Sequence, residues 1–255
     1  MTGIPIGRRV RLATVVAGVA FAATVTAATT PAWAQDISIN FGSGAGLTER
    51  VLQLIALMTV LSLAPSILVM VTSFTRIVVV LSLLRTALGT ATAPPNTVII
   101  SLALFLTAFV MGPAFERAYD IGVRPLVNNE ITAEQAFDRA SDPFRAFMLK
   151  NVREKDLKLF IGMSRETQPA RPEDLSLRVL VPAFMISELK RAFEIGFLLF
   201  LPFLVIDLVV ASILMSMGMM MLPPVVVSLP FKLIFFVLVD GWSLVAGSLV
   251  QSYGP

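Results

Sequence analysis

The 255-residue chain contains no cysteine and no histidine. Without cysteine it can form no disulfide and no thiolate metal site, and without histidine it lacks the commonest catalytic base and metal ligand. Charged residues are also scarce, at 15%, whereas hydrophobic residues make up 56%. A soluble domain is roughly half apolar and about a quarter charged. We therefore expect a membrane protein, or a subunit buried in a membrane complex, that is not an enzyme and holds no cofactor or metal.

Residues 1–34 have the three parts of a secretory signal peptide. Three arginines lie near the start, an apolar stretch rich in Ala and Val follows, and Ala32-Trp33-Ala34 has the small-x-small pattern of a cleavage site. Cleavage between Ala34 and Gln35 would leave equal numbers of basic and acidic residues, which removes the basic excess expected of a nucleic-acid-binding protein. The alternative is an uncleaved first membrane helix. Residues 35–46 are polar and Gly-rich, and we expect a flexible segment there.

Residues 47–115 are predicted to form a first helical hairpin. Its first arm is too long for one straight helix across a hydrocarbon core of about 30 Å, and Pro65 is expected to kink or divide it. The adjacent prolines at 94 and 95 indicate a loop. The second arm, Thr97–Phe115, has no charge and contains Gly112-Pro113, which should end or bend it.

Residues 116–178, called the polar region below, contain equal numbers of basic and acidic residues and are predicted to form a small helical domain outside the cytoplasm. Thr132 and Gln135 fit a capping box, which indicates a helix start. Ser141-Asp142-Pro143 resembles a second start. The apolar residues expected to give that second helix a buried face are Phe144, Phe147, Met148, Val152, Leu157, Leu159 and Phe160.

Residues 179–255 are predicted to form a second helical hairpin. Two long apolar runs flank Gly218-Met219-Met220-Met221-Leu222-Pro223-Pro224. Adjacent prolines cannot continue a helix, because neither supplies a backbone N–H and each ring clashes with the preceding turn. The break is therefore expected to be a turn between two arms.

Charged residues interrupt both arms of the second hairpin. Asp207 lies in the first arm, and Lys232 and Asp240 lie in the second. A charge at mid-membrane costs roughly 3 kcal/mol or more, so such residues usually face a partner or a water path. Asp207 and Lys232 are nearly symmetric about the methionine turn, which predicts an ion pair within or between protomers.

The entry to the second hairpin is also charged, and the residues leave two interpretations of it open. Glu188 lies close to Lys190 and Arg191, and Lys190 and Glu194 are spaced for an i, i+4 ion pair. The segment is either a surface turn beside the membrane or a belt of charges between subunits of an assembly.

The residues alone also leave two functions open. A transporter or ion channel could use Asp207, Lys232 and Asp240 as an ion relay; it would predict inverted repeats, and no convincing repeat is present. An assembly subunit would pair its charges between protomers, which agrees with the balanced charge. An intramembrane enzyme is the least supported, because no nucleophile has a base beside it.

Several long motifs, in order along the chain, resemble the FliP family of the bacterial flagellar protein-export gate, whose virulence-secretion counterpart is SctR. The resemblance covers essentially the whole chain after the signal segment, and the ending Ala246–Leu249 favours the flagellar branch. The motifs are PSILVMVTSFTR (65–76), LRTALG (84–89), APPN (93–96), ALFLT (103–107), SELK (187–190) and the run from Phe203 to Trp242.

The resemblance implies an all-α membrane protein of about four long, bent hydrophobic helices arranged as hairpins, plus a small extracytoplasmic helical domain. Such subunits form a ring, expected to be a pentamer, in the flagellar basal body at the bacterial inner membrane. With the other small membrane subunits of this type III secretion gate they build the channel for unfolded flagellar subunits. By resemblance, Met219, Met220 and Met221 would form a gasket that closes around the passing chain, a role that suits flexible apolar thioethers.

Overall fold

The computed structural model describes residues 47–90, 92–164, 171, 175–219 and 221–254. The chain divides into two parts, residues 1–57 and 58–255. Of the first part only residues 47–57 are described, as the beginning of helix α2 (Leu47–Val71). The predicted signal peptide, its cleavage site and the segment 35–46 lie outside the described residues. Everything below concerns the second part.

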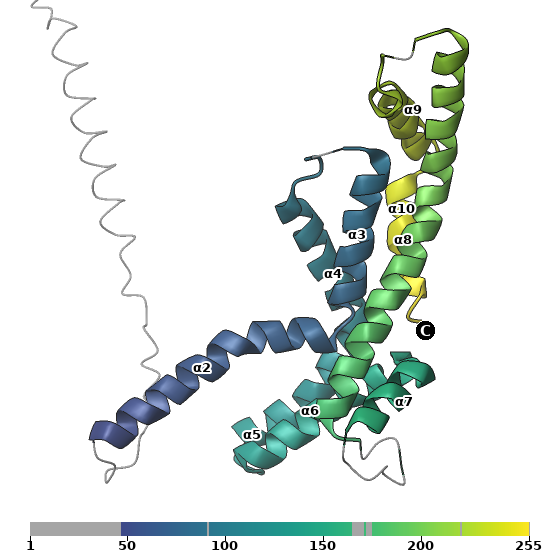
Figure 1. The fold of residues 1–255 in the computed structure, drawn as a ribbon. Coiled ribbons are helices and arrows are strands. Elements are labelled where there is room, and N and C mark those ends of the chain that lie inside the picture. The colour runs from purple at the N-terminus through teal and green to yellow at the C-terminus, as the bar shows by residue number, and fades with distance from the viewer. Residues whose placement is uncertain (1–46, 91, 165–170, 172–174, 220, 255) are drawn as a thin grey trace, which may run out of the picture. The chain divides into compact units, whose positions relative to one another are not determined.

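The described residues form helices and no strand, which confirms the prediction of an all-helical chain. Two helical stretches, Asn96–Val127 and Leu177–Ser216, are long and apolar enough to cross a membrane, and a third candidate is a broken pair bent by 63°. After α2 the elements are α3 (Phe74–Leu88), α4 (Asn96–Ala118), the π-helix η1 (Tyr119–Val123), α5 (Arg124–Val127), α6 (Ala133–Asn151), α7 (Glu154–Met163), α8 (Leu177–Ser216), α9 (Pro224–Leu238) and α10 (Gly241–Gln251) (Figure 1).

Pro65 was predicted to kink or divide the first apolar run, and it does not divide it: α2 continues through Pro65 to Val71, and the division lies at Thr72 and Ser73. At the break, the Thr72 hydroxyl accepts a hydrogen bond from the Phe74 N–H at 3.4 Å. Short hydroxyl side chains compete in this way with helical hydrogen bonds. Helix α3 therefore starts as a separate element.

Helices α3 and α4 flank the loop with the paired prolines. The Arg85 guanidinium closes this loop by donating to Asn96 Oδ1 at 2.6 Å and to the Pro94 carbonyl at 3.3 Å. Gly112-Pro113 was predicted to end or bend α4, and it does not end it: the helix continues to Ala118 and then into η1 and α5. A proline inside a helix costs about 3 kcal/mol, and here the packing of α4 against α3 and α6 offsets that cost.

The capping box of the polar region is confirmed. Gln135 N–H donates to Thr132 Oγ1 at 3.4 Å, and Thr132 N–H donates to Gln135 Oε1 at 3.3 Å. The second helix start at Ser141 is wrong, because α6 runs on through Pro143 to Asn151. The Ser141 hydroxyl donates back to the Asp138 carbonyl at 2.7 Å, inside the helix, instead of capping a new one.

The real break in the polar region lies at Val152 and Arg153, whose backbones are extended, and α7 begins at Glu154. The apolar face expected for one helix is thus divided between two. Met148 on α6 is buried, as predicted, but Leu159 on α7 is 55% exposed.

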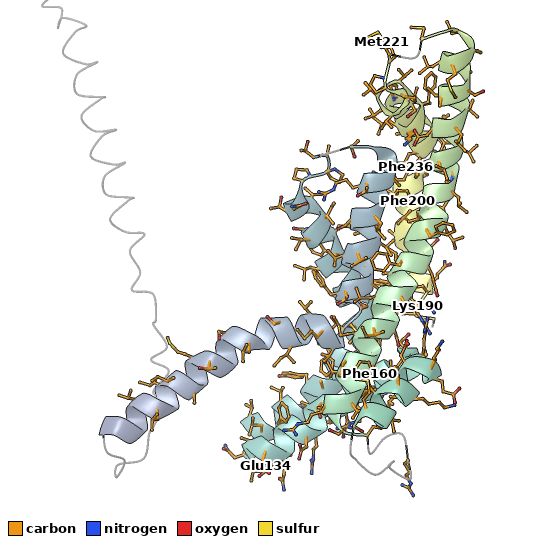
Figure 2. All side chains as sticks on the ribbon, in the orientation of Figure 1. Glu134, Phe160, Lys190, Phe200, Met221 and Phe236 are labelled. Carbon is orange, nitrogen blue, oxygen red and sulfur yellow. The ribbon has the colours of Figure 1, made fainter. Side chains whose placement is uncertain are left out.

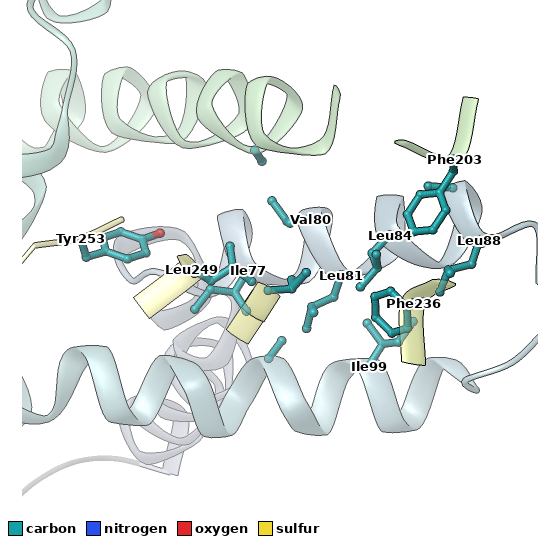
Figure 3. Close-up of a cluster of buried hydrophobic side chains, with 14 residues drawn as sticks. Ile77, Val80, Leu81, Leu84, Leu88, Ile99, Phe203, Phe236, Leu249 and Tyr253 are labelled. Carbon is teal, nitrogen blue, oxygen red and sulfur yellow. The ribbon is translucent and has the colours of Figure 1, made fainter. Parts of the chain in front are cut away.

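Helix α3 lies at the centre of the second part and packs against α8 and α4. Its side chains make the largest contribution of any helix to a buried cluster that α4, α8, α9 and α10 complete (Figure 3). At Gly196 on α8, an added Cβ would lie 2.3 Å from Leu83 Cδ1, so the Leu83 side chain would have to move to keep this close approach of α8 to α3. The labelled members of the cluster are Ile77, Val80, Leu81, Leu84, Leu88, Ile99, Phe203, Phe236, Leu249 and Tyr253.

Candidate functional site

The methionine turn joins α8 to α9 through a defined helix cap. Gly218 has φ +72°, its N–H donates to the Met215 carbonyl at 3.1 Å, and the Met219 N–H donates to the Leu214 carbonyl at 3.0 Å. These two bonds are the Schellman arrangement that ends many helices, and the left-handed residue is glycine because it has no Cβ to clash. Pro224 then occupies the first turn of α9, where a missing N–H costs nothing.

The described methionine side chains of this turn are exposed to different degrees. Met221 is 98% exposed and Met219 is 40% exposed, whereas Met220 lies outside the described residues. Figure 2 shows Met221 at the tip of the α8–α9 hairpin. Large exposed apolar groups at one point usually indicate a surface that another molecule covers.

The structure brings Asp207 and Lys232 together across the hairpin. Lys232 Nζ lies 2.7 Å from Asp207 Oδ2 and also donates to the Ala87 carbonyl at 3.2 Å. The Ser228 hydroxyl donates to the other carboxylate oxygen of Asp207 at 2.5 Å. Ala87 is in the last turn of α3, where the free carbonyls favour a cation. This cluster therefore fastens α8 and α9 to the end of α3.

Asp240 does not join that cluster. The second arm of the hairpin, expected to be continuous, is divided here into α9 and α10, which bend by 63°. Asp240 is exposed and has φ +51°, a left-handed conformation that aspartate tolerates better than most residues. It marks the bend between the two helices.

Glu188 is completely buried and pairs with Arg76 of α3, which is 1% exposed. Arg76 Nε donates to Glu188 Oε2 at 3.0 Å, and Arg76 Nη2 donates to Oε1. Arg76 also donates from Nη1 to Ser252 Oγ at 3.0 Å. A bidentate guanidinium–carboxylate pair is the strongest ionic arrangement that protein side chains offer, and its remaining donors must also be satisfied when it is buried.

Tyr253 completes this buried network from beyond the end of α10. Its hydroxyl donates to Glu188 Oε2 at 2.5 Å, and its ring lies under the guanidinium of Arg76, 3.9 Å from ring centroid to Cζ. Burial, followed by the negative charge of Glu188, raises the pKa of the Tyr253 phenol above its ordinary value. The phenol therefore stays neutral and remains a donor to Glu188.

The charged entry segment lies within helix α8. Lys190 and Glu194 are both about half exposed, with 3.9 Å between Nζ and Oε1. One turn earlier on the helix, the buried Ser187 hydroxyl donates to Asp156 Oδ2 of α7 at 2.8 Å. Glu188 and Ser187 thus hold α8 to the rest of the chain, whereas Lys190 faces outward (Figure 2).

Sequence reasoning missed the Arg76–Glu188 pair, although it noticed both residues. Arg76 interrupts an apolar run, and an arginine in such a run needs a buried anion. Lys190 and Arg191 are the cations nearest to Glu188 in sequence, whereas its observed partner, Arg76, lies 112 residues earlier in the chain. Tyr253 and Ser252 gave no sequence signal, because only the bend at Asp240 returns the end of the chain to α3.

The described residues contain no group of three or more Asp and Glu side chains arranged to hold a metal ion. The charges form ion pairs and hydrogen bonds that connect helices.

Comparisons with known proteins identify the family. The FliP family model matches residues 57–249. A flagellar biosynthetic protein FliP from Caulobacter vibrioides is 64% identical over 247 residues, which is 96% of this chain and 91% of the relative. Proteins of the same name from Rhizobium meliloti and Bacillus subtilis are each 54% identical over 217 residues; the first alignment covers 84% of this chain and 89% of the relative, and the second 85% and 98%. The chain therefore belongs to the FliP family.

Proposed function

We propose that this chain is a core subunit of the export gate of the flagellar type III secretion apparatus, and that it helps to form the channel through which unfolded flagellar subunits cross the inner membrane. The observation that carries the proposal is the family match over residues 57–249, joined to relatives named flagellar biosynthetic proteins. The two apolar stretches of membrane-spanning length support a place in the membrane.

The working unit in this proposal is a ring of identical subunits, a pentamer by family resemblance, joined to the other small membrane subunits of the gate. Exposed apolar side chains on α8 and α9 support such an assembly, because only 11% of the most apolar window of α8 is buried within the protomer. The Asp207–Lys232 cluster fixes α9 against α8, so both helices would present one rigid surface to neighbouring subunits. The ion pair of Glu188 with Arg76 likewise fixes the N-terminal half of α8 against α3.

The methionine turn would close the channel. Symmetry would bring Met219, Met220 and Met221 of each subunit around one axis, where their thioethers could seal against ions and still deform around an extended chain. The exposure of Met221 supports this role, since the protomer itself gives the side chain nothing to pack against. The polar region would lie on the periplasmic side, and no step would require catalysis or a cofactor.

The ion-relay alternative has less support. Lys232 is neutralised by Asp207 and further bonded to the Ala87 carbonyl, and Asp240 is exposed at the α9–α10 bend, outside that cluster. A relay needs groups that exchange partners, whereas Lys232 is buried and bonded to Asp207 and to the Ala87 carbonyl within one protomer.

Complementation tests the proposed function. A strain in which the gene is deleted should lose motility and should no longer secrete hook and filament subunits, and a copy of the wild-type gene should restore both. Affinity purification of the tagged chain from membranes should recover the other small membrane subunits of the gate. Normal secretion of flagellar subunits in the deletion strain would overturn the proposal.

A further inference from the structure

A pocket of about 670 Å³ lies between α4, α6 and the segment after α10. This volume is within the range of roughly 300–1,000 Å³ that is usual for small-molecule sites. Its lining residues include neither the described methionines of the turn nor Asp207 and Lys232. The pocket is therefore separate from the proposed channel closure.

One face of α4 forms the first wall of the pocket. Phe109, Pro113 and Arg117 are spaced by four residues, so they lie along the same side of the helix, and all three line the cavity. Along this face the side chains change from apolar to cationic. The change occurs where the uncharged stretch of α4 ends at Glu116 and Arg117, which is the level at which a membrane helix meets lipid headgroups.

Helix α6 forms the second wall and runs antiparallel to α4 and its continuation. Phe115 packs edge-on against Phe144 with 5.5 Å between ring centroids, and Gly122 lies against Ala140. Deeper in the pocket, Phe147 stacks on Tyr253 at 5.6 Å. The buried Arg76–Glu188 network holds Tyr253 in place, so the apolar floor is preformed.

The charges around the pocket are all of one sign. Its lining contains Arg117 and Lys150 and no carboxylate. Lys150 already interacts within the chain, but Arg117 makes no ion pair or hydrogen bond with any described residue. An unpaired guanidinium at the polar end of an apolar slot is complementary to a phosphate ester that carries a hydrocarbon chain.

We propose that this pocket binds an anionic phospholipid, with the headgroup phosphate on Arg117 and an acyl chain along Phe109 and Pro113. The lipid would fill the space between the apolar helix α4 and the polar helix α6. This inference does not depend on the channel function, because it concerns a different face of the chain.

The test uses the full chain purified in a nonionic detergent. The thermal unfolding temperature is measured as phosphatidylglycerol, phosphatidylcholine or inorganic phosphate is added, and native mass spectrometry counts the retained phospholipids. The variants are Arg117→Gln, which removes the cation, and Ala114→Trp, which fills the slot and keeps the charge. The matched control is Arg124→Gln, whose side chain is 68% exposed, pairs with Asp120 and does not line the pocket.

Phosphatidylglycerol should raise the unfolding temperature of the wild type in a saturable way, because a ligand that binds only the folded state stabilises it. Phosphatidylcholine and inorganic phosphate should not. Arg117→Gln should raise the half-saturating lipid concentration about tenfold, the loss expected for one charge-assisted contact. Ala114→Trp should abolish the saturable component, and Arg124→Gln should behave as the wild type.

Three results would each overturn the proposal. The first is that Arg117→Gln binds phosphatidylglycerol as tightly as the wild type. The second is that inorganic phosphate competes with the lipid, which would indicate a site for free anions. The third is that a disulfide forms between two copies carrying Ala114→Cys in native membranes, which would mean that a second copy occupies the pocket.

Discussion

Arg76 carries a full charge in an almost completely buried position, because a guanidinium is not deprotonated in proteins. Glu188 neutralises it, Ser252 accepts a further hydrogen bond, and the Tyr253 ring covers its face. These contacts join three segments that are far apart in the sequence. At the scale of single residues, the fold thus depends on one ion pair that is satisfied from all sides.

Glu188→Ala should lower the free energy of unfolding by about 3–5 kcal/mol, because it leaves the Arg76 charge buried without a partner. The double variant Arg76→Met with Glu188→Leu should recover most of that loss, since it removes both charges and keeps the volume. Thermal or denaturant unfolding in detergent measures both. Glu194→Ala is the control: its carboxylate is 59% exposed, so the effect should stay within about 0.5 kcal/mol. Equal stability of Glu188→Ala and the wild type would contradict the buried pair.

The raised pKa of Tyr253 predicts a pH dependence of stability. The unfolded phenol ionises near the ordinary value of 10.0, whereas the folded phenol stays protonated to higher pH. The stabilisation is thus fully present below pH 10 and is lost as pH rises above it. In a Tyr119→Phe background Tyr253 is the only tyrosine, so tyrosinate absorbance should appear together with unfolding. Tyrosinate that forms with helicity unchanged would show that the phenol is accessible.

At the scale of elements, the methionine turn is set by residues with opposite backbone preferences. Gly218 ends α8 in a left-handed conformation, and Pro224 starts α9. The turn could be predicted from the sequence, because the glycine and the prolines act on the backbone at their own positions.

Gly218→Ala should cost about 1 kcal/mol: among the described residues, none beyond its chain neighbours and the adjoining helix backbone lies within 4 Å of the added Cβ, so the left-handed backbone is what opposes it. Gly247→Ala is the matched control. That glycine lies inside α10 with equally open space around it, so alanine there should stabilise the chain by roughly 0.5–1 kcal/mol. The two unfolding temperatures should therefore move in opposite directions. A shift in the same direction would mean that the cap does not define the turn.

Other element boundaries could not be predicted from local signals. Pro65, Pro113 and Pro143 all suggested breaks, yet the helices continue through them. At Pro113, packing of α4 against α3 and α6 offsets the missing hydrogen bond, and nothing in the neighbouring sequence reports that packing. The observed divisions at Thr72–Ser73, Val152–Arg153 and Asp240 carry no proline at all. Asp207 and Lys232 could be predicted as neighbours, because they lie at similar distances on either side of one turn. No such relation connects Arg76 with Glu188.

At the scale of the whole molecule, the Asp207–Lys232 cluster would set the surface that neighbouring subunits meet. Asp207→Ala should reduce assembly, because Lys232 is only 4% exposed and would remain charged without its carboxylate. The swap Asp207→Lys with Lys232→Asp should recover part of the loss. Recovery should be incomplete, since the new carboxylate at position 232 would face the Ala87 carbonyl.

Size-exclusion chromatography of detergent-solubilised membranes measures the assembly of these variants, and secretion of flagellar subunits measures their export. Lys158→Ala is its control, because Lys158 makes an exposed ion pair with Glu154 on the same helix. If Asp207→Ala assembles and exports as well as Lys158→Ala does, the cluster has no role in assembly.

If the methionine turn seals an export channel, its loss should let ions leak through the resting gate. The triple variant Met219→Ala, Met220→Ala, Met221→Ala removes the thioethers and leaves α8, α9 and the Asp207–Lys232 cluster intact. The measurement is membrane conductance, or solute influx, in cells that overproduce the assembled gate with no substrate. The variant should still assemble, keep at least part of its export and leak ions that the wild type retains. A variant that assembles fully and stays as tight as the wild type would contradict the sealing role of the methionine turn.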